Sequence, residues 1–259
     1  MPALRLSVQA RIENEVLVHM LMRLASAPAE DQPFPHFFVE EVLPAHIYQQ
    51  LLENLPPTEI MHPMGERHRN SDGVHNRYEL PLGPEMFAQL STEQAELWCG
   101  VHKALVAPQF KQAVFAKLSR GLSFRFGIPA SEVNTIAGYP RCNLMRETEG
   151  YYIAPHPDTR KKLVTMQFAL PRDRSQADLG TTFYERSMAP RDWISVPRGF
   201  RRAKQMPFLP NCCYGFAVIN SLRLKSWHGR EVMHGEQGTR NSILHVYYAE
   251  DNGSHRYEQ

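Results

Sequence analysis

The spacing of apolar side chains divides the chain into a helical first part and a β-rich second part. Apolar residues at helical intervals predict helices over about 8–26 and 43–55, with a strand over 34–39 between them. Two more helices follow, one beginning at the Ser-Thr-Glu-Gln capping sequence of Ser91 and one at Pro108. We expect these helices to support a sheet formed by the later part of the chain.

The segment 57–84 has neither helical nor strand periodicity. Pro, Gly, His, Arg and Asn dominate it, and its apolar residues are scattered, which predicts a long loop. Long loops inside compact domains often line or cover binding sites, so this one is either a lid or a surface loop. Arg77 and Tyr78 within it are candidate substrate contacts.

Beyond about residue 123 the pattern changes to short β-type runs separated by turn residues. Short strands at this spacing predict a β-sandwich or a double-sheet jelly roll (a double-stranded β-helix), so the fold is expected to be mainly β with flanking helices. We expect a single domain over 1–259, with helical and lid elements in 1–122 and the jelly-roll core in about 123–250. The predicted strands are 135–145, 151–154, 163–170, 181–184, 193–196, 213–218 and 242–248.

The charge balance gives no support to nucleic acid binding, because 29 basic and 27 acidic side chains leave a formal net charge of +2 and are mixed along the chain. One basic concentration stands out. It is interpreted as a solvated surface loop, with attraction of an anionic substrate as the alternative. Its members are Arg160, Lys161, Lys162, Arg198, Arg201, Arg202 and Lys204.

The cysteines and the N-terminal segment favour a cytoplasmic protein. The four cysteines, at positions 99, 142, 212 and 213, form neither a spaced disulfide framework nor a CxxC metal pattern, which fits a reducing compartment. The apolar stretch 16–24 contains His19 and Arg23, so it is too polar for a signal sequence and too short to span a bilayer. We therefore expect no membrane association.

A histidine and a carboxylate two residues apart, His156 and Asp158, stand at the end of a predicted strand. Side chains two apart on a strand point to the same side, so both can face one metal ion. With a histidine from a distant strand, they would form the triad that binds iron(II) and leaves three coordination positions open. A closed zinc site is disfavoured because no cysteine flanks them.

Further motifs follow His156 in an ordered series. In this series the chain resembles the 2-oxoglutarate/iron(II) oxygenase superfamily, near its prolyl-hydroxylase-like branch. The resemblance covers roughly residues 136–249 and, more loosely, 34–56. The motifs are Lys162–Phe168, Leu179-Gly180-Thr181, Pro207–Asn211, Ser226-Trp227-His228-Gly229 and Thr239-Arg240-Asn241-Ser242.

The resemblance implies Fe(II) as the metal, 2-oxoglutarate as co-substrate and O2 as oxidant. It makes His156 and Asp158 the proximal ligands and His228 the distal one. His234 is a rival for the distal position, but it sits in a Gly-rich turn, whereas His228 lies in the Ser-Trp-His-Gly setting that matches the family. The carboxylate at Asp158 argues against a halogenase.

The resemblance also assigns the co-substrate contacts. Arg240 would bind the remote carboxylate of 2-oxoglutarate, with Ser242 beside it, because a guanidinium fork suits a carboxylate. Thr165 and Gln167 share one face of a predicted strand and, together with Asn143, are further candidate contacts.

Position 230 departs from the family pattern, because it holds Arg where a small apolar residue is usual. The side chain lies two residues after the predicted distal ligand, so the departure affects local packing or substrate preference. Arg230 and Tyr152 therefore join Arg77 and Tyr78 as candidate substrate contacts.

The expected reaction is hydroxylation of an unactivated C–H bond in a small polar molecule such as an amino acid, a sugar or a natural-product intermediate. Desaturation, epimerisation and ring closure stay open. Two alternatives are a hydroxylase of a protein residue and a non-catalytic jelly-roll binding module. A cupin-type enzyme would need an H-x-H arrangement with a following Glu, which is missing around His156. The sequence leaves substrate identity and oligomeric state open.

Overall fold

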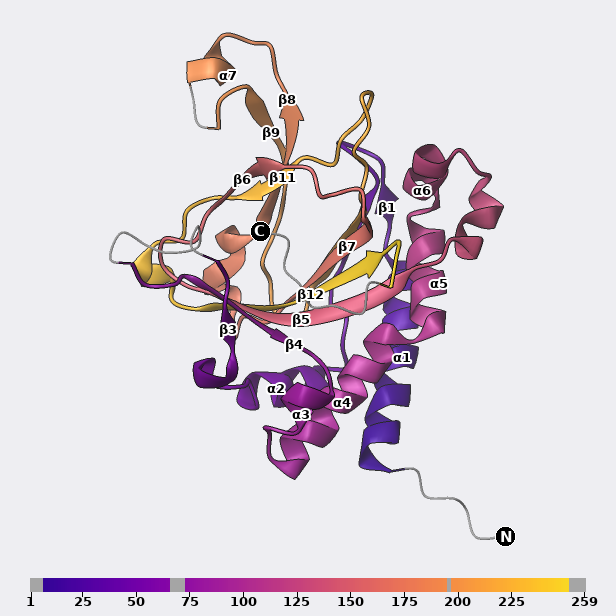
Figure 1. The fold of residues 1–259 in the computed structure, drawn as a ribbon, viewed down its shortest axis with the longest axis vertical. Helices are drawn as coiled ribbons and strands as arrows, with labels where there is room; N and C mark the ends of the chain where they lie inside the picture. The colour runs from indigo at the N-terminus through magenta and orange to yellow at the C-terminus, as the bar shows by residue number, and fades with distance from the viewer. Residues whose placement is uncertain (1–6, 66–72, 195–196, 252–259) are drawn as a thin grey trace.

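The computed structural model describes residues 7–65, 73–194 and 197–251, which form two antiparallel β-sheets and a group of helices (Figure 1). The larger sheet has eight strands in the order β1-β2-β10-β7-β12-β5-β4-β3. In that order the strands span Ala29–Glu30, His36–Val39, Cys213–Ala217, Lys162–Ala169, Arg240–Tyr248, Tyr139–Glu147, Arg77–Pro81 and His62–Pro63.

The smaller sheet has four strands in the order β6-β11-β8-β9. They span Ile153–His156, His228–Arg230, Thr181–Arg186 and Phe200–Met206. This sheet lies across the face of the larger sheet that the helices leave uncovered, and the β8–β9 hairpin extends beyond it (Figure 1). Aromatic side chains, among them Phe34, Phe183 and Phe216, fill the space at one end between the sheets.

The α-helices between residues 8 and 126 cover the opposite face of the larger sheet (Figure 1). Their apolar side chains pack with those of the strands into the main core, in which Trp98 and Met20 have no exposed surface. None of the helices among the described residues is long and apolar enough to cross a membrane. The α-helices are α1 (Val8–Ser26), α2 (Ala45–Glu53), α3 (Pro84–Phe87), α4 (Thr92–Val106), α5 (Pro108–Lys117), α6 (Ser119–Phe126) and α7 (Arg191–Ile194), and the 3-10 helices are η1 (Thr58–Ile60), η3 (Ala130–Thr135), η4 (Arg174–Leu179) and η5 (Gly235–Gln237).

Several sequence-based predictions of elements are confirmed. The mainly antiparallel β architecture with flanking helices is present, and Ser91 caps α4 through a reciprocal hydrogen-bond pair with Gln94. On β7 the buried Thr165 and Gln167 share one face, while Val164, Met166 and Phe168 belong to the helix-covered core. The strand pattern therefore directs polar side chains into the space between the two sheets.

The prediction of a loop without regular structure over 57–84 was wrong in its first part, which contains η1 and β3, and in its last part. Residues 77–81 form strand β4, which pairs with β5 so that Arg77 lies opposite Glu147. The strand escaped the sequence pattern because its inward side chains, Arg77 and Glu79, are charged. Whether the segment 57–84 is a lid stays open, because residues 66–72 in its middle lie outside the described residues.

The predicted strand over 193–196 was also wrong. Arg191–Ile194 forms the short helix α7, whose turn begins at Pro190, a residue suited to a helical first turn; residues 195 and 196 are outside the described ranges. The strand lies later, at β9, within the segment interpreted as a basic surface loop. Helix α6 was missed, and the strands of the later part of the chain begin at β5, at Tyr139, and not soon after residue 123.

Strand β9 is the edge of the smaller sheet, and charged side chains are common on exposed edges because they oppose further strand pairing. Its basic residues have acidic partners. Arg201 pairs with Glu185 at 2.6 Å. The other pairs are Arg202 with Glu231 and Lys204 with Glu30. A solvated, internally compensated face therefore describes this segment better than a free anion-attracting patch.

His245 on β12 provides a test of acid stability. It is completely buried against Phe110 and Tyr247, and neither ring nitrogen has a partner among the described residues. Burial lowers the pKa of His245 to about 3, so below pH 6.5 this histidine binds a proton in the unfolded chain but not in the folded one, and stability falls as the pH drops. Between pH 8 and pH 5 this difference in protonation should lower the free energy of unfolding by roughly 2 kcal/mol.

We therefore expect His245→Phe to lose less stability on acidification than the wild type by about that amount. Urea unfolding at pH 8 and pH 5 would measure it, with the exposed His46→Gln variant as the control. Equal acid sensitivity in the His245→Phe variant and the wild type would contradict the expectation.

A candidate metal centre beside a buried arginine cluster

Strand pairing brings the three predicted metal ligands together. His156 ends β6 and His228 begins β11, and the two histidines are paired opposite each other in the smaller sheet. Their ring centroids lie 4.4 Å apart. One potential ligand atom from each of His156, Asp158 and His228 lies within 4.8 Å of those of the other two, and this is the single such group of three or more in the described residues.

The histidine rings are oriented by their own backbone. Nδ1 of His156 lies 3.0 Å from the carbonyl oxygen of Ala154, and Nδ1 of His228 lies 2.9 Å from that of Ser226. A ring that donates through Nδ1 keeps the lone pair of Nε2 for a metal. Two imidazole nitrogens and one carboxylate oxygen form the donor set of a facial triad for iron(II).

The protonation states suit metal binding. Burial lowers the pKa of His228 to about 4 and also lowers the pKa of His156, so both rings are neutral near pH 7. Burial raises the pKa of the Asp158 carboxyl, but the charge of Lys162 and the hydrogen bonds from Lys162 and Thr165 hold that pKa well below its usual range. The site therefore offers deprotonated ligands without any proton having to leave.

Asp158 is fixed by two donors on β7. Lys162 Nζ donates to Oδ1 and Thr165 Oγ1 donates to Oδ2, each at 2.6 Å. Thr165, which was predicted as a co-substrate contact, donates its hydrogen bond to the Asp158 carboxylate. The sequence analysis overlooked this role of Lys162, although its position four residues after Asp158 was the available signal.

Gly229, between His228 and Arg230, lies directly against β6. A Cβ atom there would stand 2.7 Å from the carbonyl oxygen of Ile153 and 3.1 Å from the carbonyl carbon of Ala154. Such distances require the strands to separate, which would move His228 away from His156.

We expect Gly229→Ala to weaken metal binding by roughly 10- to 100-fold, the range found when the support of a ligand is disturbed. Anaerobic iron(II) titration would measure it. Gly83→Ala is the matched control, since nothing lies within 4 Å of a Cβ atom at that position. Unchanged affinity in Gly229→Ala would show that β11 tolerates the displacement.

His234, the rival for the distal position, is exposed and precedes η5. The structure brings His228, and not His234, to the other two residues of the group.

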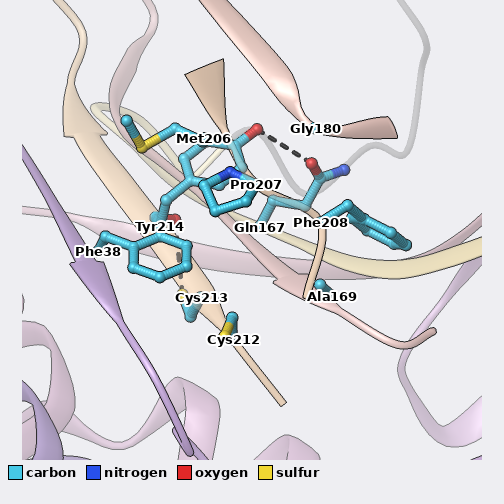
Figure 2. A pocket seen from close by; sticks show the side chains of 10 residues that line it. All are labelled: Phe38, Gln167, Ala169, Gly180, Met206, Pro207, Phe208, Cys212, Cys213 and Tyr214. Carbon is cyan, nitrogen blue, oxygen red and sulfur yellow. Dashed lines mark hydrogen bonds between the residues drawn. The ribbon is translucent and has the colours of Figure 1, made fainter. Parts of the chain in front are cut away.

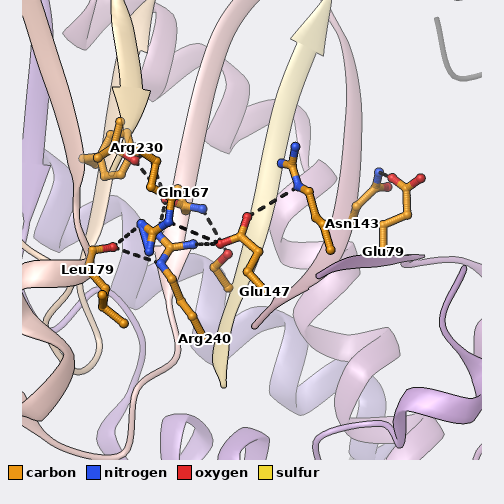
Figure 3. A network of polar contacts seen from close by, with 11 residues as sticks. Glu79, Asn143, Glu147, Gln167, Leu179, Arg230 and Arg240 are labelled. Atoms are coloured by element: carbon orange, nitrogen blue, oxygen red, sulfur yellow. Dashed lines mark hydrogen bonds and ion pairs between the residues drawn. The ribbon is translucent and has the colours of Figure 1, made fainter. Parts of the chain in front are cut away.

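Next to the candidate metal centre, three arginines lie near one buried glutamate, Glu147, and Figure 3 shows two of them, Arg230 and Arg240. Nε of Arg77 lies 3.5 Å from Oε1 of Glu147, and Nε of Arg230 lies 3.9 Å from Oε2. Arg240 Nη1 donates to Oε2. The guanidiniums of Arg77 and Arg230 also lie 5.0 and 5.8 Å from the ring centroid of Tyr151. We call Arg77, Arg230, Arg240 and Glu147 the arginine cluster.

Arg240, the predicted contact of the remote carboxylate, is held by protein groups on every nitrogen. Besides Glu147, it donates from Nε to the carbonyl oxygen of Leu179 at 3.0 Å and from Nη2 to Oε1 of Gln167 at 2.7 Å. Its guanidinium lies 3.9 Å from the ring centroid of Phe208, and 1% of its surface is exposed. Arg240 is thus tightly packed into the fold.

The other predicted contacts are distributed around this cluster. Gln167 Nε2 donates to Ser242 Oγ at 3.0 Å, which joins both residues to Arg240. Asn143 lies further along β5, and its Nδ2 donates to Glu79 Oε2 at 3.1 Å. Tyr152 is 40% exposed. The sequence analysis did not identify Glu147, which the strand register alone places opposite Arg240 and Arg77.

A narrow pocket is lined by ten residues, Gln167 and Tyr214 among them (Figure 2). Tyr214 Oη donates to Gln167 Oε1 at 3.0 Å. None of the three candidate ligands lines it. The remaining lining residues are Phe38, Ala169, Gly180, Met206, Pro207, Phe208, Cys212 and Cys213.

No protein-family model and no curated protein matches the sequence. Solved structures do match. A dioxygenase for auxin oxidation from Arabidopsis thaliana, in a complex with 2-oxoglutarate, is 11% identical; the match covers 94% of this chain and 90% of that chain with a TM-score of 0.53. A prolyl-4-hydroxylase from Pseudomonas putida is 13% identical, with 90% and 98% covered and a TM-score of 0.49. An oxidoreductase of the 2OG-Fe(II) oxygenase family from Burkholderia pseudomallei is 12% identical, with 85% and 88% covered and a TM-score of 0.48.

At these identities the likeness concerns the fold alone. The Arabidopsis structure shows that the chain shares the fold of a 2-oxoglutarate-binding dioxygenase. The predicted resemblance to this superfamily is thereby confirmed at the level of architecture.

Proposed function

We propose that this protein is an Fe(II)/2-oxoglutarate-dependent oxygenase that couples decarboxylation of 2-oxoglutarate to hydroxylation of a C–H bond in a small polar molecule. The convergence of His156, Asp158 and His228 beside the arginine cluster carries the proposal. In this reading the two sheets are the walls of a double-stranded β-helix.

The residues present fit the metal. Two neutral imidazoles and one ionised carboxylate would hold iron(II) and leave open positions for 2-oxoglutarate and O2. When bound, the metal and co-substrate would supply the oxidising chemistry. The chain itself orients both histidine rings through backbone carbonyls and keeps Asp158 ionised through Lys162.

The residues present also fit a dicarboxylate. Three guanidiniums against one carboxylate give the arginine cluster an excess of positive charge, which the buried carboxylates of Glu79 and Asp158 offset in part at Arg77. Buried charge without a partner is costly, so an anion is the natural complement. The remote carboxylate of 2-oxoglutarate would supply it, in a pocket to which Arg240, Ser242 and Gln167 also belong.

An anaerobic titration tests the proposal. Apoprotein with iron(II) and 2-oxoglutarate should develop the visible charge-transfer band of the chelate, and admission of O2 should yield succinate. Magnesium in place of iron(II) is the control, because it gives no such band. A folded protein that shows neither band nor succinate would refute the proposal.

A further inference from the structure

Two guanidiniums of the arginine cluster have buried nitrogens without a hydrogen-bond partner among the described residues. These nitrogens are Nε of Arg77 and both Nε and Nη2 of Arg230. The two guanidiniums also lie over the ring of Tyr151, at 5.0 and 5.8 Å from its centroid. Buried polar atoms in folded proteins are nearly always hydrogen-bonded, so these nitrogens indicate that the cluster is short of acceptors.

The cluster is also short of negative charge. Burial and the charge of Arg240 lower the pKa of Arg230 to about 9, whereas a sufficient counter-charge would keep the pKa of a guanidinium at its usual value or above. In the described part of the chain, the charged side chains of the candidate metal centre, the arginine cluster and the neighbouring Glu79 are four cations and three carboxylates. They are Arg77, Lys162, Arg230 and Arg240 against Glu79, Glu147 and Asp158.

The proposed co-substrate does not remove this imbalance. The double positive charge of iron(II) and the double negative charge of 2-oxoglutarate cancel each other, so together they leave the charge of the site unchanged. The remote carboxylate of 2-oxoglutarate would be held at Arg240, with Ser242 and Gln167 beside it. The loaded site would therefore keep one positive charge, and buried charge without a partner is costly.

Arg77 is the member of the cluster best placed to meet a further ligand. Its side chain is 15% exposed, whereas those of Arg230 and Arg240 are 4% and 1% exposed. Burial lowers the pKa of Arg77, but Tyr151 and neighbouring carboxylates that include Asp158 raise it above its usual range. Because Asp158 is a candidate metal ligand, a molecule whose anionic end binds Arg77 would lie beside the metal centre.

We propose that the substrate is a carboxylic acid that is a monoanion at neutral pH, and that Arg77 receives its carboxylate, supported by the charge of Arg230. A phosphate monoester fits less well, because its charge of about −1.5 to −2 at pH 7 exceeds the excess of the site. The inference rests on the proposed function and narrows its substrate class from small polar molecules to carboxylic acids.

Propionate and propionamide test the assignment, because they have the same size and differ in charge. Anaerobic calorimetry would measure the binding of each probe to the protein saturated with iron(II) and 2-oxoglutarate, so that Arg240 is already occupied. We expect propionate to bind at least about tenfold more tightly than propionamide, the factor that a hydrogen bond to a charged group provides.

In Arg77→Gln the preference for propionate should fall to within about threefold, and 2-oxoglutarate binding, followed by the charge-transfer band, should weaken less than propionate binding. Arg77→Lys should keep part of the preference, because the charge stays and the fork is lost. Arg120→Gln is the matched control. It removes an exposed guanidinium on helix α6 and should keep the full preference.

Three results would overturn the assignment: a preference retained in Arg77→Gln, a loss of 2-oxoglutarate binding larger than the loss of propionate binding, or no preference in the wild type. If Arg77→Gln fails to fold, by circular dichroism, an unchanged preference in Arg77→Lys would overturn it instead. A folded wild type without a charge-transfer band would refute the proposed function, and the same two probes on the apoprotein would still decide whether Arg77 binds a carboxylate.

Discussion

The His228→Ala variant is expected to lose iron(II) binding, by more than about 100-fold, whereas His234→Ala should bind iron(II) like the wild type. Removal of a group that only hydrogen-bonds to a metal ligand already lowers metal affinity by about 10- to 100-fold, and loss of the ligand itself lowers it more. His228 lies opposite His156 in the smaller sheet, while His234 is exposed on the loop that follows.

The two variants form a matched pair, because each removes one imidazole from the same short stretch of chain. Anaerobic titration with iron(II), monitored by calorimetry, measures the iron(II) affinity of each variant. Circular dichroism checks that both variants are folded. Loss of binding in His234→Ala with retention in His228→Ala would transfer the distal position to His234 and require a rearrangement of the segment 228–240.

The second large effect is expected at Glu147. Glu147→Gln keeps the shape of the side chain but leaves the three arginines without their carboxylate, and breaking a buried ion pair in this way costs about 3–5 kcal/mol. The pKa of Glu147 is lowered by the surrounding arginines against the raising effect of burial, so the group is ionised at neutral pH. Its charge is therefore part of the folded structure.

Urea unfolding of the apoprotein would measure this loss, with the exposed Glu149→Gln as the control for removal of one negative charge nearby. Glu149→Gln should change stability by less than about 0.5 kcal/mol. A Glu147→Gln variant as stable as the control would mean that the arginines are compensated by other groups, and the charge excess inferred for the cluster would be incorrect.

The candidate ligands could be predicted because their signal is local. His156 and Asp158 are two residues apart on an extended segment, and the period of a strand is enough to direct both side chains to one side. The same period gave the inward faces of β7 and β12, on which Thr165, Gln167 and Ser242 lie. Family resemblance added the distant His228, which spacing alone could not place.

The arginine cluster could not be predicted because it depends on non-local strand register. Glu147, Arg77 and Arg240 are far apart in sequence, and they meet only because β5 lies between β4 and β12 with these three residues in line. A one-residue shift in register would turn Glu147 to the other face. Sequence periodicity contains no information on register between distant strands.

Strand β4 and strand β9 were missed for a related reason. A strand is recognised in a sequence by apolar side chains that alternate with polar ones. Strand β4 directs Arg77 and Glu79 inward, where an apolar residue is the expected signal. On β9, an edge strand, most side chains are exposed and charged. The alternating pattern is therefore missing from β4 because its inward side chains are charged, and from β9 because charged side chains protect its exposed edge.

The candidate site is divided between the two sheets. The histidines and Arg230 belong to the smaller sheet, whereas Glu147, Arg240 and Lys162 belong to the larger one. A co-substrate held at both the metal and the arginine cluster would act as a cross-link between the sheets, and its binding would stabilise the fold by an amount that rises with the logarithm of ligand concentration above the dissociation constant. The concentration of 2-oxoglutarate would then affect the stability of the protein as well as its rate of turnover.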